Sequence, residues 1–133
     1  MSATYFGSWE LIPELCHHSK GKAPDAALYQ IDDEGERIAF TISWTADGQD
    51  QTVSFAPLAD GTMEEAEVNM PAHRIIPVSD SQLDGEAFVG DRRIATASRR
   101  VSMDGTLLSV LQVNEFVEGE VERVFQVYRR REE

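Results

Sequence analysis

The sequence has a single cysteine, Cys16, so an internal disulfide is impossible. One thiol suits a reducing compartment and excludes a small secreted scaffold held by disulfides. The segment before Trp9 has neither a basic stretch nor a long apolar one, which argues against a secretory signal. No run approaches the ~20 apolar residues of a membrane-spanning helix. We therefore expect a cytoplasmic protein with no membrane partner.

Basic residues are also scarce, with 12 Lys and Arg against 24 Asp and Glu and a formal net charge of −12. Such a surface repels nucleic acids, because binding them requires cations that neutralise phosphates. The imbalance is uneven: residues 1–91 hold 17 acids and 4 bases, whereas residues 92–133 hold 7 acids and 8 bases. We expect the late arginines to lie on solvated strand faces and to pair with acids from the first part. No nucleic-acid partner is expected.

A helical period of 3.6 residues is absent, and short turn signals punctuate the chain instead. Asp-Gly and similar pairs favour the positive φ angles of tight hairpins and so join neighbouring antiparallel strands. This rhythm is typical of an all-β meander rather than of βαβ units. The turn pairs are Glu34-Gly35, Asp47-Gly48, Asp60-Gly61, Asp84-Gly85, Gly90-Asp91, Asp104-Gly105 and Glu118-Gly119.

The segments between the turns alternate apolar and polar residues, most clearly along 37–45. A period of two indicates strands with one buried face. The edges of a meander are protected when the sheet closes on itself. The length suits one domain over residues 1–133, so we predict a single closed, antiparallel, up-and-down β-barrel of roughly eight to ten strands. The predicted strands are 5–11, 27–32, 37–45, 51–57, 63–68, 73–79, 82–89, 92–102, 106–116 and 120–130.

The start and the end of the chain carry a family resemblance. Gly7-Ser8-Trp9 resembles the Gly-x-Trp that opens lipocalins and related barrels, the calycins. In those families the Trp seals one end of the barrel and a basic residue near the last strand packs across it. Arg129 or Arg130 stands where that partner is expected, and we assign the pair to Trp9 and Arg129. The segment 99–107, followed by 127–129, also resembles a common pattern of bacterial lipocalin-like proteins, so the resemblance implies the lipocalin-like fold.

A closed barrel of this size either packs its interior as core or holds one small ligand there. Polar groups among aromatic side chains favour a ligand cavity. Gln126-Val127-Tyr128 stands where similar fatty-acid-binding barrels carry Arg-x-Tyr, which holds a carboxylate in those proteins. Because Gln has no charge, we expect a small, neutral or weakly polar hydrophobic ligand. The interior candidates are Tyr29, Ile31, Phe40, Ile42, Trp44, Phe55, Phe88, Arg99, Leu111, Gln126 and Tyr128.

No motif in the chain predicts a metal, a cofactor or a catalytic centre. Cys16-His17-His18 is the one cluster of soft ligands, and it is too small for a zinc site without distant partners. Residues 80–91 only partly match a calcium loop, and a hairpin explains them better. The acidic runs 32–34 and 64–67 fit solvated turns. Gly-x-Ser-x-Gly, HExxH and paired CxxC motifs are missing.

Two further functions stay open beside ligand binding. The first is a small lipocalin-like enzyme, an isomerase, cyclase or decarboxylase, with Tyr128 as acid, Arg99 as oxyanion stabiliser and a carboxylate not yet assigned. The second is a non-catalytic structural or dimerisation module, in which Leu108, Val110 and Phe116 form the interface of a homodimer. We expect either a monomer or a homodimer.

Overall fold

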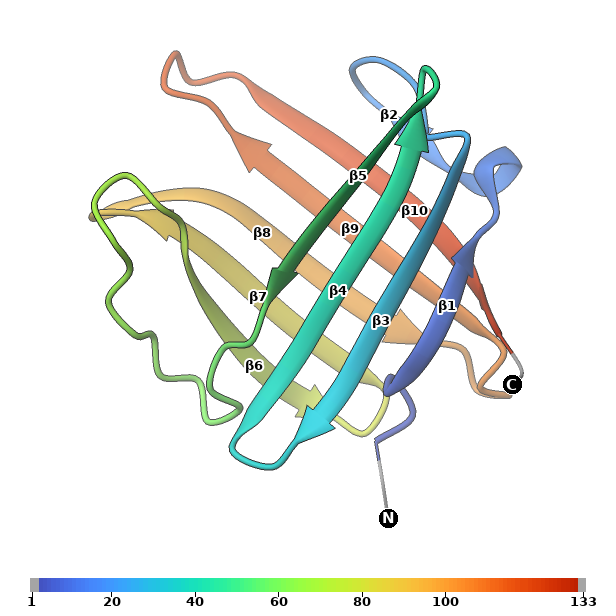
Figure 1. The fold of residues 1–133 in the computed structure, drawn as a ribbon, viewed down its shortest axis with the longest axis horizontal. Helices are drawn as coiled ribbons and strands as arrows, with labels where there is room; N and C mark the ends of the chain where they lie inside the picture. Colours follow the sequence, from blue (N-terminus) through green and yellow to red (C-terminus); the bar gives the residue numbers. More distant parts are fainter. Residues whose placement is uncertain (1–2, 132–133) are drawn as a thin grey trace.

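The computed structural model describes residues 3–131, which form one strongly curled antiparallel sheet (Figure 1). A single 3-10 turn at Pro13–Leu15 is the one helical segment in this part of the chain. The all-β, up-and-down architecture predicted from the turns and the alternation is confirmed. The strands are β1 (Gly7–Leu11), β2 (His17–His18), β3 (Ala26–Glu34), β4 (Arg37–Ala46), β5 (Gln49–Phe55), β6 (Ala72–Ser79), β7 (Gln82–Val89), β8 (Arg92–Val101), β9 (Leu107–Glu115) and β10 (Val121–Arg130).

Two local predictions are wrong. Residues 63–68 form no strand and belong to the irregular link 56–71 between β5 and β6. Asp84-Gly85 is not a turn but lies inside β7, whereas the β6–β7 hairpin turns at Asp80-Ser81. The reason is that Leu83, Gly85 and Ala87 alternate toward the interior, so the strand pattern continues through the glycine.

The sheet has one seam without backbone pairing. Its strand order is β5-β4-β3-β1-β10-β9-β8-β7-β6, with β2 attached to β10, so β5 and β6 are its two edges. Among the described residues no ladder joins these edges. Instead the rings of Phe55 and His73 stack across them with centroids 4.1 Å apart. Arg37 also ties the link to β4, donating to the Ala56 carbonyl and to the Glu64 carboxylate. Side-chain contacts therefore lie between β5 and β6, where a fully closed barrel would have backbone hydrogen bonds.

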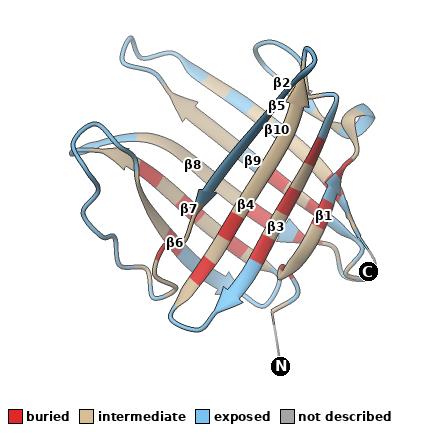
Figure 2. Ribbon diagram, in the orientation of Figure 1, coloured by how far each residue is buried: buried red, intermediate tan, exposed pale blue. Residues whose placement is uncertain are grey.

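The core lies inside the curled sheet, and its buried residues come from every long strand except β5 (Figure 2). Trp9 is fully buried and donates its indole N–H to the Tyr5 carbonyl over 3.0 Å. The guanidinium of Arg130 lies 4.1 Å from the centroid of the Trp9 ring. A methyl group at Gly7 would lie 2.8 Å from Arg130 Nη1, and the φ of Gly7 is +131°. The glycine and the tryptophan of the Gly-x-Trp start therefore both accommodate this arginine.

The partner of Trp9 is Arg130 and not Arg129, which corrects the sequence-based assignment. In the β1–β10 ladder Trp9 lies opposite Arg130, and Glu10 lies opposite Arg129. Residues directly opposite share a face of the sheet, so Arg130 points inward with Trp9. Arg129 points outward and forms an exposed ion pair with Glu10 at 3.4 Å.

Candidate functional site

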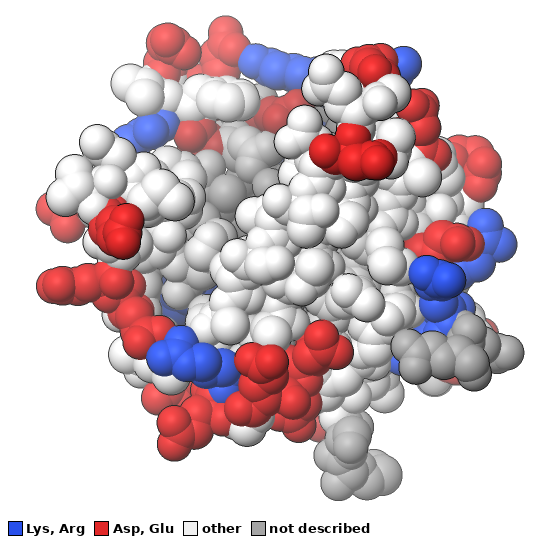
Figure 3. All heavy atoms as spheres, in the orientation of Figure 1, with Lys and Arg blue, Asp and Glu red and all other residues white. Residues whose placement is uncertain are grey.

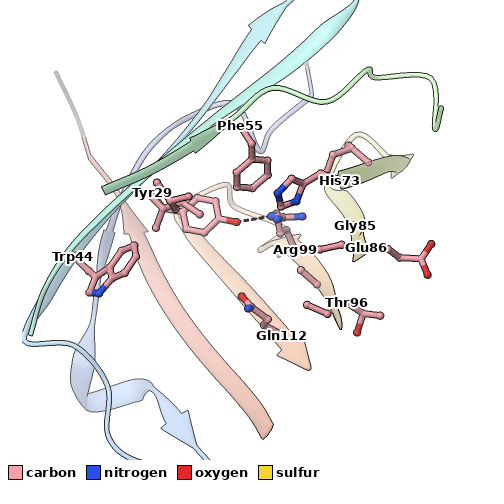
Figure 4. A pocket seen from close by; sticks show the side chains of 15 residues that line it. Tyr29, Trp44, Phe55, His73, Gly85, Glu86, Thr96, Arg99 and Gln112 are labelled. Atoms are coloured by element: carbon pink, nitrogen blue, oxygen red, sulfur yellow. Dashed lines mark hydrogen bonds between the residues drawn. The ribbon is translucent and has the colours of Figure 1, made fainter. Parts of the chain in front are cut away.

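A cavity of about 290 Å³ lies inside the curled sheet, beside the seam between β5 and β6 (Figure 4). Alternation along β3, β4 and β5 turns large apolar side chains into it, as expected for strands with one buried face. One of its walls therefore consists of aromatic and branched side chains. These are Tyr29, Ile42, Trp44, Val53 and Phe55.

Apart from Arg99, the wall contributed by β7 and β8 has almost no side-chain volume. Its other inward residues at the cavity are Gly85, Ala87, Ala95 and Ala97. The register places Gly85 opposite Ala97, and Ala87 opposite Ala95, so the four small residues form one continuous patch. We call this patch the small-residue wall. The space inside the barrel is therefore left open by the sequence of these two strands.

Arg99 supplies the single guanidinium at this cavity. Its side chain is carried inward by β8 and is only 5% exposed. The Nε atom donates to the Tyr29 hydroxyl over 2.6 Å, and the guanidinium carbon lies 4.6 Å from the centroid of the Phe40 ring. The Nη1 atom is buried and has no hydrogen-bond partner among the described residues. A buried donor of a charged group without an acceptor carries an uncompensated desolvation cost.

No carboxylate of the described chain neutralises Arg99. Glu86 contributes to the cavity lining, but its carboxylate points away from Arg99 (Figure 4). That carboxylate forms ion pairs with Arg74 and Arg93, and these hydrogen-bonded partners lower the pKa of Glu86. The cavity therefore holds a positive charge without a counter-ion, within a protein whose net charge is strongly negative.

His73 lies beside Arg99 at the seam. Burial lowers the pKa of His73, and the nearby positive charge of Arg99 lowers it further. The imidazole is therefore held in its neutral form at neutral pH. A neutral ring can stack on Phe55 and present a nitrogen to the cavity without adding a second charge.

Comparison with solved structures fixes the fold. A secretory abundant heat soluble protein from Ramazzottius varieornatus matches with a TM-score of 0.63 at 13% identity, over 98% of both chains. The zebrafish ileal bile acid-binding protein, crystallised with cholic acid, matches with a TM-score of 0.57 at 12% identity, over 96% of this chain and 99% of the other. The chain has the lipocalin-like fold of the calycins. No family model and no curated protein sequence matches it.

In this calycin fold, five of the predicted interior residues come together at the cavity: Tyr29, Ile42, Trp44, Phe55 and Arg99. Phe40 is buried beneath the Arg99 guanidinium, and Ile31 belongs to the packed core. Both remain inward-facing without lining the cavity.

Gln126 and Tyr128 are not among the lining residues. Tyr128 donates its hydroxyl to Gln126 Oε1 over 2.6 Å, and its ring packs edge-on against Tyr29. Burial raises the pKa of Tyr128 well above its ordinary value, so it stays protonated. The acid and the oxyanion stabiliser of the enzyme hypothesis, Tyr128 and Arg99, thus do not meet at the cavity.

Leu111 and Phe88 lie outside the interior, contrary to prediction. Leu111 is 44% exposed and lies opposite Phe125 on the outer face of β9 and β10. Phe88 directly follows the inward-facing Ala87 in β7 and packs against the outward-facing Arg74. Ordinary alternation along the strand therefore turns it to the outer face of the sheet.

The dimer hypothesis named the wrong face of β9. Leu108 and Val110 are buried inside the sheet, at 0% and 3% exposure, because they alternate inward with Gln112. Phe116 is exposed at the end of this strand. The exposed large apolar residues of β9 are instead Leu107 and Leu111.

The remaining sequence motifs form no site in the described part of the chain. His17 and His18 make the short strand β2 against β10, and no group of three or more potential metal ligands gathers anywhere among residues 3–131. Asp80 lies in the turn of the β6–β7 hairpin, as predicted, whereas Asp84 lies inside β7. No helix in these residues has the length and apolar character needed to cross a bilayer.

The sequence reasoning missed His73 and the small-residue wall. His73 follows no motif, and its role depends on an opposite edge strand that is far away in the sequence. Alanine and glycine have low strand propensity, so their positions gave no signal of an inward-facing patch. The alternation of Ala95, Ala97 and Arg99 was the signal available, since an arginine in phase with small inward residues has room to lie inside.

Proposed function

We propose that this calycin barrel binds a small apolar molecule that carries an acidic head group, with Arg99 as the counter-ion. The observation that carries the proposal is the buried Nη1 donor of Arg99 without an acceptor, at an apolar cavity. Unsatisfied buried donors are rare in native structures and call for a missing partner. A bound carboxylate supplies such a partner through a charge-assisted hydrogen bond.

The charge of the head group differs from the sequence-based expectation. That expectation of a neutral ligand relied on Gln126, which has no charge. The cation is supplied by β8 instead of β10, because Arg99 and not residue 126 reaches the cavity. Tyr29 supports the same site, since its hydroxyl accepts from Arg99 Nε and keeps its own proton available for a ligand oxygen.

Head-group pairs of probes test this proposal. Isothermal titration calorimetry would compare undecanoate with undecan-1-ol, and 2-naphthoate with 2-naphthalenemethanol. We expect at least one acid to bind about tenfold tighter than its alcohol, since a charge-assisted hydrogen bond contributes about 1.5–3 kcal/mol. Replacing Arg99 with methionine should remove that preference. Equal affinities for acid and alcohol would contradict the role of Arg99, and no binding of any probe would contradict ligand binding itself.

A further inference from the structure

The shape of the cavity restricts the ligand further than its charge does. Facing sheets normally lie about 10 Å apart, and side chains from both sides fill the space between them. Here the β7–β8 side contributes, apart from Arg99, only the hydrogen atoms or methyl groups of the small-residue wall. The space of one layer of side chains is therefore open across from the large residues of β4 and β5.

The open layer is a slot bounded by aromatic rings. Trp44 and Phe55 lie on its large-residue side, and the guanidinium of Arg99 lies between them and the small-residue wall (Figure 4). Its volume of about 290 Å³ is just below the range of about 300–1,000 Å³ for ligand pockets, so the ligand must be small. A flat ring system fills such a slot and can pack against the aromatic side chains in offset or edge-on geometry.

Gly85 makes room for the Arg99 guanidinium at the small-residue wall. A methyl group at this position would lie 3.1 Å from Arg99 Nη1 and 3.0 Å from Ile75 Cδ1. The guanidinium therefore packs directly against the backbone of β7, where a larger residue would displace it. The open space for a ligand lies beside the guanidinium, along Ala87, Ala95 and Ala97.

Rigid and flexible ligands differ in the entropy they lose in such a slot. A flexible acyl chain loses the freedom of every rotatable bond that is held in the cavity. A fused ring loses none internally. We infer that the cavity selects a small, flat aromatic acid in preference to a flexible acyl acid. This inference rests on the proposed function, because it assumes that Arg99 holds an acid.

Two acids with the same number of carbon atoms test the inference on the unmodified protein. 2-Naphthoate is flat and rigid, whereas undecanoate is flexible and has more apolar surface to bury. We expect 2-naphthoate to bind at least about tenfold tighter by calorimetry. Equal or tighter binding of undecanoate would overturn the shape inference and leave the role of Arg99 intact. If neither acid binds, the proposed function fails together with the inference.

A variant that fills the slot gives an independent arm. Ala97→Leu places a side chain on the small-residue wall and should weaken 2-naphthoate binding at least about tenfold. Ala39→Leu makes the same change on the outer face of β4 and should leave affinity unchanged. If Ala97→Leu does not fold, Ala97→Val serves in the same comparison. A folded variant at position 97 that binds 2-naphthoate as the original protein does would overturn the inference.

Discussion

Arg130 and Arg99 both lie inside the sheet with an aromatic ring beneath the guanidinium, but their hydrogen bonds differ. Beside Trp9, Arg130 Nε donates to the Gly105 carbonyl over 2.8 Å, and Nη1 donates to the Phe6 carbonyl over 2.9 Å. Its Nη2 donates to the Thr4 carbonyl. At the cavity, Arg99 donates from Nε alone to Tyr29, and its Nη1 is unsatisfied among the described residues.

The difference indicates a structural role for Arg130, whereas Arg99 retains a donor for a ligand. Backbone carbonyls are fixed by the fold, so a guanidinium that satisfies three of them is part of the architecture. A guanidinium with a free donor at a cavity retains its capacity to bind an anion. The acidic side chains of the protein lie mainly around the periphery of the face shown in Figure 3, and they leave this internal charge unpaired.

The largest effect on stability should come from the substitution of Arg130. Replacing Arg130 with methionine leaves three backbone carbonyls without their charged donor and removes the contact with Trp9. We expect the free energy of unfolding to fall by about 3 kcal/mol, as measured by urea denaturation. A loss below about 1 kcal/mol would mean that the hydrogen bonds of Arg130 to these carbonyls contribute little to stability.

The matching change at the cavity should act on binding and not on folding. Arg99→Met removes a poorly compensated buried cation, so the free energy of unfolding should stay within about 1 kcal/mol of the original value or rise. Affinity for 2-naphthoate should fall by about tenfold or more, as measured by calorimetry on the same preparation. A large loss of stability would place Arg99 in the same class as Arg130.

A smaller effect should come from His73 when the pH changes. Because the folded state lowers the pKa of His73 below the ordinary value of about 6.5, the unfolded state takes up the proton first as the pH falls. The unfolded state then binds more protons, so the free energy of unfolding should decrease below about pH 6.5, by up to about 1 kcal/mol per pH unit. Urea denaturation of the original protein and of His73→Phe, which keeps a ring against Phe55, isolates this contribution. Parallel pH profiles for the two proteins would contradict it.

The smallest effect should come from Arg129, the neighbour of Arg130 in the sequence. Its exposed ion pair with Glu10 is weakened by solvent. Arg129→Ala should change the free energy of unfolding by less than about 0.5 kcal/mol in urea. A loss similar to that of Arg130→Met would indicate that the two side chains had exchanged faces.

The fold was predictable because its signals are local. Alternation along 37–45 and hairpin pairs such as Asp47-Gly48 each act within one or two strands, and both positions of that pair have positive φ in the structure. The choice between Arg129 and Arg130 is different, since it depends on the register between β1 and β10, which are far apart in the sequence. A shift of one residue exchanges the two faces, and no local pattern fixes that register.

The site was predictable only in part for the same reason. The large side chains of β3 to β5 could be predicted because they are apolar, and Arg99 because it is charged and lies among small residues. The cavity itself results from the small side chains at positions 85, 87, 95 and 97. These leave a cavity only because of where the opposite wall lies, and the sequence does not give that distance. The expectation of a neutral ligand came from Gln126, which does not line the cavity, whereas the proposal of an acid rests on Arg99 from another strand.

The seam between β5 and β6 also has a consequence for the order of folding. Apart from the ladders of β1 and β2, every pairing in the sheet joins strands that are neighbours along the chain, and those hairpins close loops of low entropic cost. Since nothing pairs β5 with β6, the ladder between β1 and β10 is the long-range step that unites the two halves of the sheet. We expect it to form late and to limit the folding rate, because it closes the longest loop in the chain.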